Sequence, residues 1–390
     1  MPTLVLDNGS HAIKCGYADD VGGPRTVPNT TARSRRTRRV YVGDEIDASE
    51  GSGLYYRSPF ERGYLVGWDS EALVWDRVLG PAVLGCTPAE TDLAVSEPVF
   101  NFAQIQRTLD EVVFEEYRFA SLLRAPAPRL AAELVADEAE CLLVVDAGHA
   151  ATHAVPYHGL RQQSVGVRRV DVGGRMLTSY LKETVSFRYW DMMDEPYIMA
   201  DVKEKCCFVS QDFGRDLDAA RADRRGVGLD YVLPDLATHR RGFVREPGAA
   251  AAGAAAGAQV LPLGNERFAV PEALFHPSDV GLAQGGVHHA VAQAIAACDE
   301  ALRPVLCANV VLVGGSAALP GLRERLEREV QALVPHRVRV AAPDAPAACA
   351  WRGACALAAR PAAAARWRVA RAQYDELGPD RTAAHFAALV

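Results

Sequence analysis

The chain lacks the features that mark membrane and secreted proteins. No apolar run reaches the roughly 18 residues that a membrane-spanning helix needs, and the first predicted strand begins too near the N-terminus to leave room for a signal peptide. The nine cysteines are scattered and include no Cys-x-x-Cys pair, so we expect neither a disulfide framework nor a zinc site. These absences predict a protein of the cytosol or nucleus with reduced cysteines and no membrane partner.

Two further absences narrow the type of binding site. No Gly-x-x-x-x-Gly-Lys-Ser/Thr sequence occurs, which disfavours a P-loop nucleotide-binding protein. The net charge of −7 gives the surface as a whole no attraction for nucleic acid or an anionic membrane. Any contact with DNA would therefore have to come from a local patch.

Length and composition are those of a globular protein with more than one core. The 390 residues exceed the size at which one core usually stops growing, and the shares of hydrophobic (49%) and charged (23%) residues are ordinary. Strand-like and helix-like segments alternate through most of the chain, which favours α/β lobes. We predict strands at Leu4–Leu6, Cys141–Val145, Thr152–Pro156 and Val310–Val313, and helices at Ile105–Tyr117, Leu177–Val185, Val287–Cys298 and Leu322–Val330.

Two segments have an unusual composition. Gly248–Ala258 contains only Gly and Ala, and we interpret it as an exposed insert because it has no large side chains to bury. Thr31–Arg39 carries five arginines. Such a run is most often a solvated loop, and the alternative is a nuclear-localisation or nucleic-acid patch.

A short internal repeat, called the echo below, is the part of the sequence most informative about a binding site. LVLDNGSHAIKCGY opens the chain and LLVVDAGHAATHAVPY resembles it later, each an apolar strand that ends in Asp-x-Gly and re-enters a second strand. The echo aligns Asp7 with Asp146 and Gly9 with Gly148. A single Asp-x-Gly is more often an ordinary hairpin turn, but two copies at the ends of apolar strands favour a functional pair.

These turns suit a phosphate chain. Their amides can face anionic oxygens, and each glycine lets the backbone come close. Asp7 and Asp146 can each hold a hydrated divalent cation, Ser10 can donate a hydroxyl and Lys14 can supply a point charge.

A third glycine turn follows a predicted strand and precedes a helix. In NVVLVGGSAALPG it consists of Gly314, Gly315 and Ser316. This turn is either a tight strand-helix connection or a place where the backbone approaches a ligand.

In this order and spacing, the three turns resemble the actin superfamily. The matching segments are DNGSHAIK, DAGHAATHAVP, DVKEKCCFVSQDF, VGGSAALPG and NERFAVPEALFHPSD, and the resemblance extends from Leu4 to about Leu357. It implies an α/β, actin-like, two-lobed fold with a nucleotide cleft between the lobes. The implied parts are lobe 1 at 1–138 with an outer subdomain at about 29–65, lobe 2 at 139–335 with an outer subdomain at about 173–272 that contains the 248–258 insert, and a segment at 336–390 that returns to lobe 1.

Other segments resemble one nuclear class of actin-related proteins more than conventional actin. They are GYLVGWDSEALVWD, EPVFNF, LDEVVFEEYRFASLLR, VKEKCCFVSQDFGRDLD and LDYVLPDLATHRRGF. This resemblance implies a non-catalytic subunit of an ATP-dependent chromatin-remodelling complex that exchanges a variant histone. The implied partners are a remodeller ATPase subunit, a small zinc-binding subunit and, through the complex, nucleosomes and histones. The implied location is the nucleus, with the cytoplasm left open as a second one.

The resemblance also implies a set of cofactor-binding residues for ATP or ADP with magnesium. Asp7 and Asp146 would hold the metal through water. The phosphates would lie against Asp7, Gly9, Ser10, Lys14, Asp146 and Gly148, and the ribose and base against Gly174, Lys203, Glu204, Gly314, Gly315 and Ser316. The alternative interpretation of Lys203 and Glu204 is a solvated helix face.

Departures from actin concern hydrolysis. His11 stands where actin has Gly, and His149 where actin has Asp. The region Ala127–Ala132 lacks the Gln that orients the attacking water in actin, although His153, which matches actin's second water-positioning residue, is present. We therefore expect nucleotide binding with very weak or absent turnover.

Two other functions stay open. One is an active ATPase or phosphotransferase of the same superfamily, which would need a positioned base for its acceptor. The other is a cytoskeletal filament former like actin. The arginines of Thr31–Arg39, which correspond to actin's filament-gripping loop, should repel a second copy, so we do not expect a homopolymer.

Overall fold

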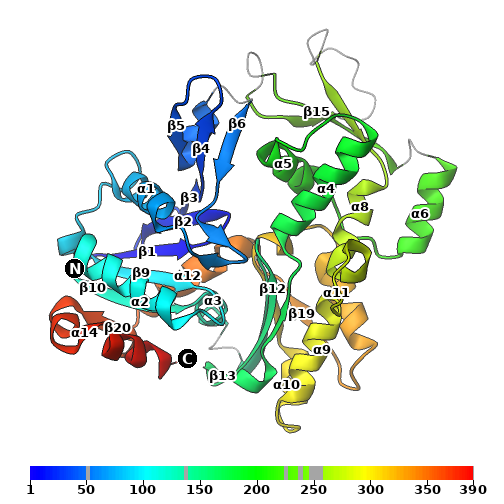
Figure 1. The fold of residues 1–390 in the computed structure, drawn as a ribbon. Helices are drawn as coiled ribbons and strands as arrows, with labels where there is room; N and C mark the ends of the chain where they lie inside the picture. Colours follow the sequence, from blue (N-terminus) through cyan, green and yellow to red (C-terminus); the bar gives the residue numbers. More distant parts are fainter. Residues whose placement is uncertain (50–52, 136–138, 224–226, 236–239, 246–257, 390) are drawn as a thin grey trace.

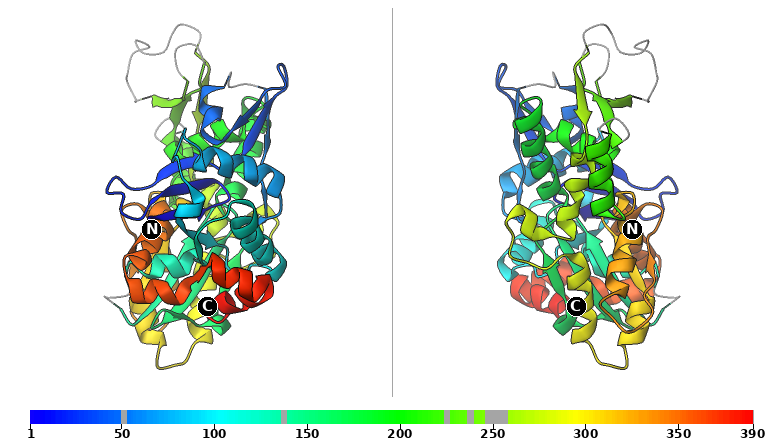
Figure 2. Two further views of the ribbon diagram at one scale, coloured as in Figure 1. Left: turned by 90° about the vertical axis from the view of Figure 1, so that its left-hand side faces the viewer. Right: turned by 90° about the vertical axis from the view of Figure 1, so that its right-hand side faces the viewer.

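Two large β-sheets form the centres of two lobes that lie side by side (Figure 1). The structure, a computed structural model, describes residues 1–49, 53–135, 139–223, 227–235, 240–245 and 258–389. Seen from its two sides in Figure 2, the molecule is taller than it is wide. The two lobes therefore lie next to one another in a flattened shape. This is the two-lobed α/β arrangement expected from the sequence.

The sheet of the first lobe joins strands from both ends of the chain. β1 and β2 form an antiparallel hairpin, and β9 and β10 continue the sheet in parallel with β1. The strand order is β20 (Arg368–Ala370), β10 (Ser121–Pro126), β9 (Asp92–Glu97), β1 (Thr3–Asn8), β2 (Ala12–Tyr17) and β3 (Arg25–Pro28).

The sheet of the second lobe repeats this arrangement. β11 and β12 form the hairpin that corresponds to β1 and β2, and β18 runs parallel to β11. The strand order is β13 (Arg161–Gln162), β12 (Thr152–His158), β11 (Cys141–Ala147), β18 (Val310–Val313) and β19 (Val340–Ala341), with β14 (Arg168–Val170) also paired to β12. The four strands predicted from the sequence are all present.

Helices cover both sheets because their apolar faces pack on the strands. The four predicted helices are present as α2, α4, α9 and α11, and α2 continues into a π-helical turn at Val112–Glu116. The helices of the first lobe are α1 (Trp68–Leu79), α2 (Ala103–Glu111), α3 (Ala127–Ala132), α12 (Cys349–Ala358), α13 (Pro361–Trp367) and α14 (Arg371–Ala387). Those of the second lobe are α4 (Gly174–Arg188), α5 (Pro196–Cys206), α6 (Phe213–Ala222), α8 (Glu266–Ala269), α9 (Val287–Ala297), α10 (Arg303–Ala308) and α11 (Leu322–Gln331).

Helices α3 and α12 connect the two cores. Leu130 and Ala354 pack with the first sheet, whereas Ala131 and Cys349 pack with the second. The two helices touch at Gly353, where an added Cβ would lie 1.8 Å from the carbonyl oxygen of Leu130. Only glycine permits this close approach, so this crossing fixes how the two lobes meet.

Each lobe carries a smaller outer sheet. In the first lobe it consists of β5 (Val40–Val42), β4 (Thr31–Ser34) and β6 (Leu54–Arg57), followed by a hairpin of β7 (Phe60–Glu61) and β8 (Tyr64–Leu65). In the second lobe it consists of β16 (Phe243–Arg245), β15 (Leu229–Val232) and β17 (Val260–Leu263). These sheets lie at the same end of the molecule, beyond the large sheets (Figure 1).

Two expectations about loops need comment. Thr31–Arg39 is not a loop throughout, because its first four residues form β4 and pair with both β5 and β6. The exposed turn is limited to Arg35–Arg39. Nearly all of the predicted Gly248–Ala258 insert lies outside the described residues.

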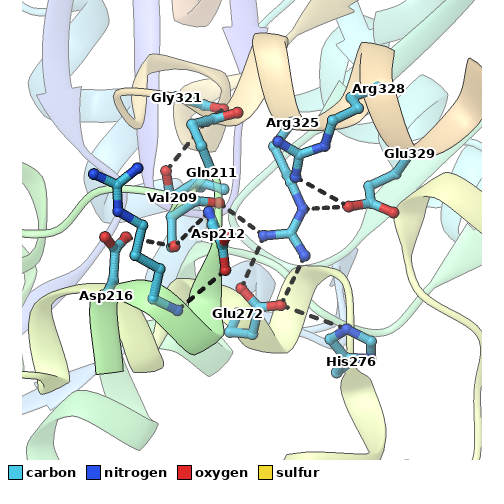
Figure 3. A network of polar contacts seen from close by, with 12 residues as sticks. Val209, Gln211, Asp212, Asp216, Glu272, His276, Gly321, Arg325, Arg328 and Glu329 are labelled. Carbon is cyan, nitrogen blue, oxygen red and sulfur yellow. Dashed lines mark hydrogen bonds and ion pairs between the residues drawn. The ribbon is translucent and has the colours of Figure 1, made fainter. Parts of the chain in front are cut away.

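A buried ion pair fastens the outer face of the second lobe. Arg325 of α11 donates to Glu272 at 3.0 and 3.4 Å and to the carbonyl oxygen of Ser210 at 2.7 Å, and both charged side chains are almost fully buried. Glu329 and His276 extend the network (Figure 3). Removing one partner of such a pair strands the other charge, so the network fixes α11 against the Pro271–Leu274 turn.

The chain passes back to the first lobe later than predicted. β19 still belongs to the second sheet, since it pairs with β18, so the return follows residue 341 and not 335. All nine cysteines are free, as expected. Within the described residues, no helix combines the length and apolar character that crossing a membrane requires.

Candidate functional site

The two Asp-x-Gly turns face each other from the two lobes. Asp7 lies near the end of β1, opposite Lys14 of β2, and Asp146 lies at the same place on β11, opposite His153 of β12. The rings of His11 and His149, which belong to the two turns, lie 4.7 Å apart. The fold thus brings together the two halves of the echo.

Asp7 is held by groups on both of its neighbouring strands. Lys14 Nζ lies 3.2 Å from its Oδ2, and the hydroxyl of Ser96 donates to its Oδ1 at 2.6 Å. The Ser96 hydroxyl also accepts a hydrogen bond from the amide of Asn8 at 2.9 Å. Because these bonds fix its carboxylate, Asp7 can orient water or a cation in the cleft.

Asp146 is in a different electrostatic state. Burial and then the charge of Asp7 raise its pKa to about 6, and Lys14 only partly offsets them. A cation between the two carboxylates would relieve this repulsion. Within the described residues, no cluster of three or more His, Cys, Asp or Glu side chains could chelate a metal, so water and phosphate oxygens would supply its other ligands.

The third glycine turn lies against the second. Gly314 has a φ of +93°, and an added Cβ would lie 2.6 Å from Asp146 Oδ1 and 2.5 Å from the carbonyl oxygen of Ala147. Glycine is therefore required here for both conformation and space. A Cβ at Gly315 would meet nothing within 4 Å, which leaves its backbone open to a ligand.

Lys203 of α5 is buried beside this turn without a carboxylate partner among the described residues. Its Nζ donates to the carbonyl oxygen of Gly174 and to Thr178 Oγ1, each at 3.1 Å, and burial lowers its pKa. A Cβ added to Gly174 would lie 3.3 Å from Lys203 Nζ and 3.4 Å from both Ser316 Oγ and His149 Nδ1. Polar atoms from three elements thus converge where the ribose was predicted.

The remaining predicted residues differ in position. No group among the described residues accepts a hydrogen bond from the amides of Ser10 or His11, so this turn can still donate to an anion. A Cβ on Gly9 would lie 2.8 Å from the carbonyl oxygen of Ala12, so the first turn needs its glycine. A Cβ on Gly148 would lie 3.2 Å from the carbonyl oxygen of Ala151, a tight contact that a small shift could relieve. Glu204 is exposed on α5, next to Lys203.

The two histidines that distinguish these turns from those of actin are in contact. The ring centroids of His11 and His149 lie 4.7 Å apart. Part of the His11 side chain is exposed to solvent, but protein atoms surround most of its ring. This desolvation, together with the charges of Lys203 and Lys14, lowers the pKa of His11 to about 4. Burial and the charge of His11 lower the pKa of His149 well below its usual range. Both rings are therefore neutral at pH 7.

A row of rings continues from this pair to the outer subdomains. Tyr197 of α5 stacks on His11 with ring centroids 6.5 Å apart, and on Tyr56 of β6 with centroids 5.3 Å apart. The row alternates between the lobes, because His11 and Tyr56 belong to the first and His149 and Tyr197 to the second. It thus joins the lobes on one side of the site.

Two exposed ion pairs also join the outer subdomains. Arg35 binds Asp194 at 2.9 Å, and Arg241 binds Asp47 at 2.5 Å. Figure 1 shows the two outer parts facing one another at the top of the molecule. Each exposed pair contributes at most about 1 kcal/mol, so these contacts stabilise the closed arrangement of the lobes only weakly.

The two positions linked to hydrolysis are occupied by structural side chains. Arg129 of α3, in the region without the Gln, is buried, and its Nη1 lies 2.6 Å from Glu133 Oε1. His153 has a pKa lowered to about 4, mainly by burial, and its Nε2 has no hydrogen-bond partner among the described residues. Arg129 is a cation that cannot accept a proton, and the lowered pKa leaves His153 a weak base.

Sequence reasoning missed three contributors to the site. Ser96, which holds Asp7, lies on a different strand, β9, and no local motif marks it. Thr178 could have been found as the residue one helical turn after Gly174. No sequence pattern marks Tyr197 as a site residue, because its contact with His11 joins two lobes and depends on how they are arranged.

Comparison with known proteins decides the family. The family model described as Actin matches residues 1–387. The chain belongs to the actin family.

Several curated relatives carry the name of one class of actin-related proteins. The chain is 40% identical to actin-like protein ARP6 of Cryptococcus neoformans, over 97% of this chain and 83% of the relative. It is 39% identical to actin-related protein 6 of Drosophila melanogaster, over 92% and 93%. It is 38% identical to actin-related protein 6 of Neurospora crassa, over 99% and 94%. The similarity covers both lobes, so this is an actin-related protein.

Proposed function

We propose that this actin-family chain is a non-catalytic nuclear subunit of an ATP-dependent chromatin-remodelling complex that exchanges a variant histone. The similarity to proteins named actin-related protein 6, along nearly the whole chain, supports this role. A remodeller ATPase subunit and a small zinc-binding subunit would be its direct partners, and nucleosomes would be reached through the complex. The exposed turn at Arg35–Arg39 would contribute to partner binding or nuclear entry.

Within that role the site binds ADP or ATP with magnesium as a clasp between the lobes. The observation that carries this proposal is the contact between the two Asp-x-Gly turns, whose His11 and His149 rings lie 4.7 Å apart. One turn carries the Asp7–Lys14 pair and the other carries Asp146. Lys14, Ser10 and the two turns would offset the phosphate charge. Magnesium near the two carboxylates would neutralise the rest. A ligand that touches both lobes stabilises the folded chain by an amount that grows with the logarithm of its concentration.

Turnover of the bound nucleotide is expected to be very slow or absent. Hydrolysis needs a water molecule held in line with the terminal phosphate and a group that takes its proton. Arg129 is a cation engaged with Glu133, and the lowered pKa of His153 makes it a weak proton acceptor. Losing such a group typically lowers a rate on the order of a hundred- to ten-thousand-fold.

Tagged purification of the chain from nuclear extract tests the assembly. Recovery with a large ATPase and a small zinc-binding protein is expected. Recovery as a polymer of the chain alone would instead support the filament function and overturn the proposal.

Thermal melting and phosphate release test the cleft. The melting temperature of the purified chain should rise with magnesium and nucleotide while phosphate release stays at background. Brisk release by the isolated chain would show an active ATPase. No thermal response at any nucleotide concentration would overturn the clasp.

A further inference from the structure

The contact between His11 and His149 leaves no space between the tips of the two turns. Ring centroids 4.7 Å apart are near the lower limit for aromatic side chains in contact. No phosphoryl group fits between rings at that separation. A phosphate chain held by both turns must therefore end before the ring pair, or the rings must part.

The backbone of His149 is held in place within its own lobe. The amide of Arg175 donates to its carbonyl oxygen at 2.8 Å, and the amide of Gly174 donates to the carbonyl oxygen of Gly148 at 3.0 Å. An added Cβ at Gly173 would lie 2.7 Å from the His149 carbonyl oxygen. The turn is thus packed tightly against the start of α4.

His11 is backed from the other side. Its ring stacks on Tyr197, which stacks on Tyr56. Because His11 and His149 belong to opposite lobes, separation of the lobes would part their rings. The exposed Arg35–Asp194 and Arg241–Asp47 pairs oppose that separation weakly.

The ring pair also offers little to a third phosphate. Both imidazoles are neutral at pH 7, so they add no positive charge. The cations whose charges act on the two rings are Lys14, Lys203 and Arg175. These two lysines and the amides of Ser10 and His11 suit a shorter phosphate chain.

We propose that His11 and His149 restrict the closed cleft to nucleoside diphosphates, so that a triphosphate binds only when the lobes part. This inference rests on the proposed nucleotide function. A ligand shifts a conformational equilibrium only by its differential affinity for the two states. The diphosphate should therefore favour the closed form and the triphosphate the open form.

The test is calorimetric titration of the full chain with magnesium-ADP and magnesium-ATP. We expect ATP to bind about tenfold or more weakly than ADP, because its third phosphate clashes with the ring pair in the closed form. A tenfold difference in Kd corresponds to about 1.4 kcal/mol of binding free energy. In the double variant His11→Gly, His149→Gly the ratio should fall to near one. His336→Gly, in a loop after α11, is the matched control and should keep the wild-type ratio. X-ray scattering should give a larger radius of gyration with ATP than with ADP for the wild type.

The outcomes separate this inference from the proposed function. Equal affinities and equal radii for the wild type would overturn the diphosphate restriction and leave the nucleotide function standing. An unchanged ratio in the folded double variant would show that the histidines do not cause the preference. If the wild type and the double variant bind neither nucleotide, the nucleotide function fails and this inference fails with it.

Discussion

Asp7 and Asp146 end the central strands of opposite lobes, and burial together with the charge of Asp7 raises the pKa of Asp146 to about 6. At neutral pH the chain therefore keeps two carboxylates near each other that only Lys14 partly offsets. Such an arrangement is unfavourable without a cation and favourable with one. Repulsion of this kind is typical of functional sites.

Replacing this charge should separate binding from stability. Asp146→Asn is expected to raise the melting temperature of the ligand-free chain at pH 7, because it removes a buried, repelled carboxylate. It should also abolish the thermal response to magnesium and nucleotide. Differential scanning fluorimetry with and without ligand measures both, and Asp218→Asn on the exposed face of α6 is the control. A lower melting temperature without ligand would mean that Asp146 stabilises the turn.

A second buried acid predicts a pH dependence of stability. Glu71 of α1 is fully buried and accepts hydrogen bonds from Trp75 at 3.1 Å and Asn29 at 3.3 Å. Burial raises its pKa to about 7 despite these bonds. A carboxyl whose pKa is raised on folding stabilises the protein most at low pH, and this contribution is lost as the pH rises toward 7.

The expected loss between about pH 4.5 and 7 is on the order of 3 kcal/mol. Urea denaturation at several pH values should show this decline in the wild type and not in Glu71→Gln. Glu90→Gln, at an exposed position, should follow the wild type. Parallel profiles for all three proteins would contradict the prediction.

The contact between α3 and α12 predicts a steric penalty. Gly353→Ala must push the two helices apart, because its Cβ would overlap the carbonyl oxygen of Leu130. Overpacking of this kind costs about 1–3 kcal/mol, more than the gain of up to about 1 kcal/mol from replacing Gly in a helix. Gly22→Ala, where a Cβ would meet nothing within 4 Å, is the control. A variant more stable than the wild type in urea would show that the helices can move apart.

The arginine turn is expected to be dispensable for folding. Replacing Arg35, Arg36, Arg38 and Arg39 by Ser should change the free energy of unfolding by no more than about 1 kcal/mol, because exposed ion pairs contribute little. Nuclear accumulation or partner recovery should fall, and fluorescence imaging and tagged purification measure these. A marked drop in melting temperature would mean that the turn holds the outer subdomains together.

Local patterns were enough to predict the two hairpins and the third glycine turn. An apolar strand that ends in Asp-x-Gly is typical of a tight turn into a second strand. The sequence therefore predicted that Asp7 and Asp146 lie at the ends of two strands. Contacts between lobes carried no such signal. The sequence showed that His11 and His149 differ from actin, but not that their rings touch, because that contact depends on how α3 and α12 set the lobes. The predicted end of lobe 2 at residue 335 left β19 in the segment that returns to lobe 1. A two-residue strand is too short to show a hydrophobic pattern, so no sequence pattern indicated that β19 belongs to the second sheet.

The crossing of the chain between the lobes has a consequence during synthesis on the ribosome. β20 completes the edge of the first sheet beside β10, and Tyr374 and Phe386 of α14 fill the core below it. These residues are translated long after the rest of that lobe has emerged. The first lobe therefore waits with an unpaired strand edge and an open core while the second lobe is made, and such exposed surfaces aggregate readily. The first lobe is therefore exposed to aggregation until its last helix has been made.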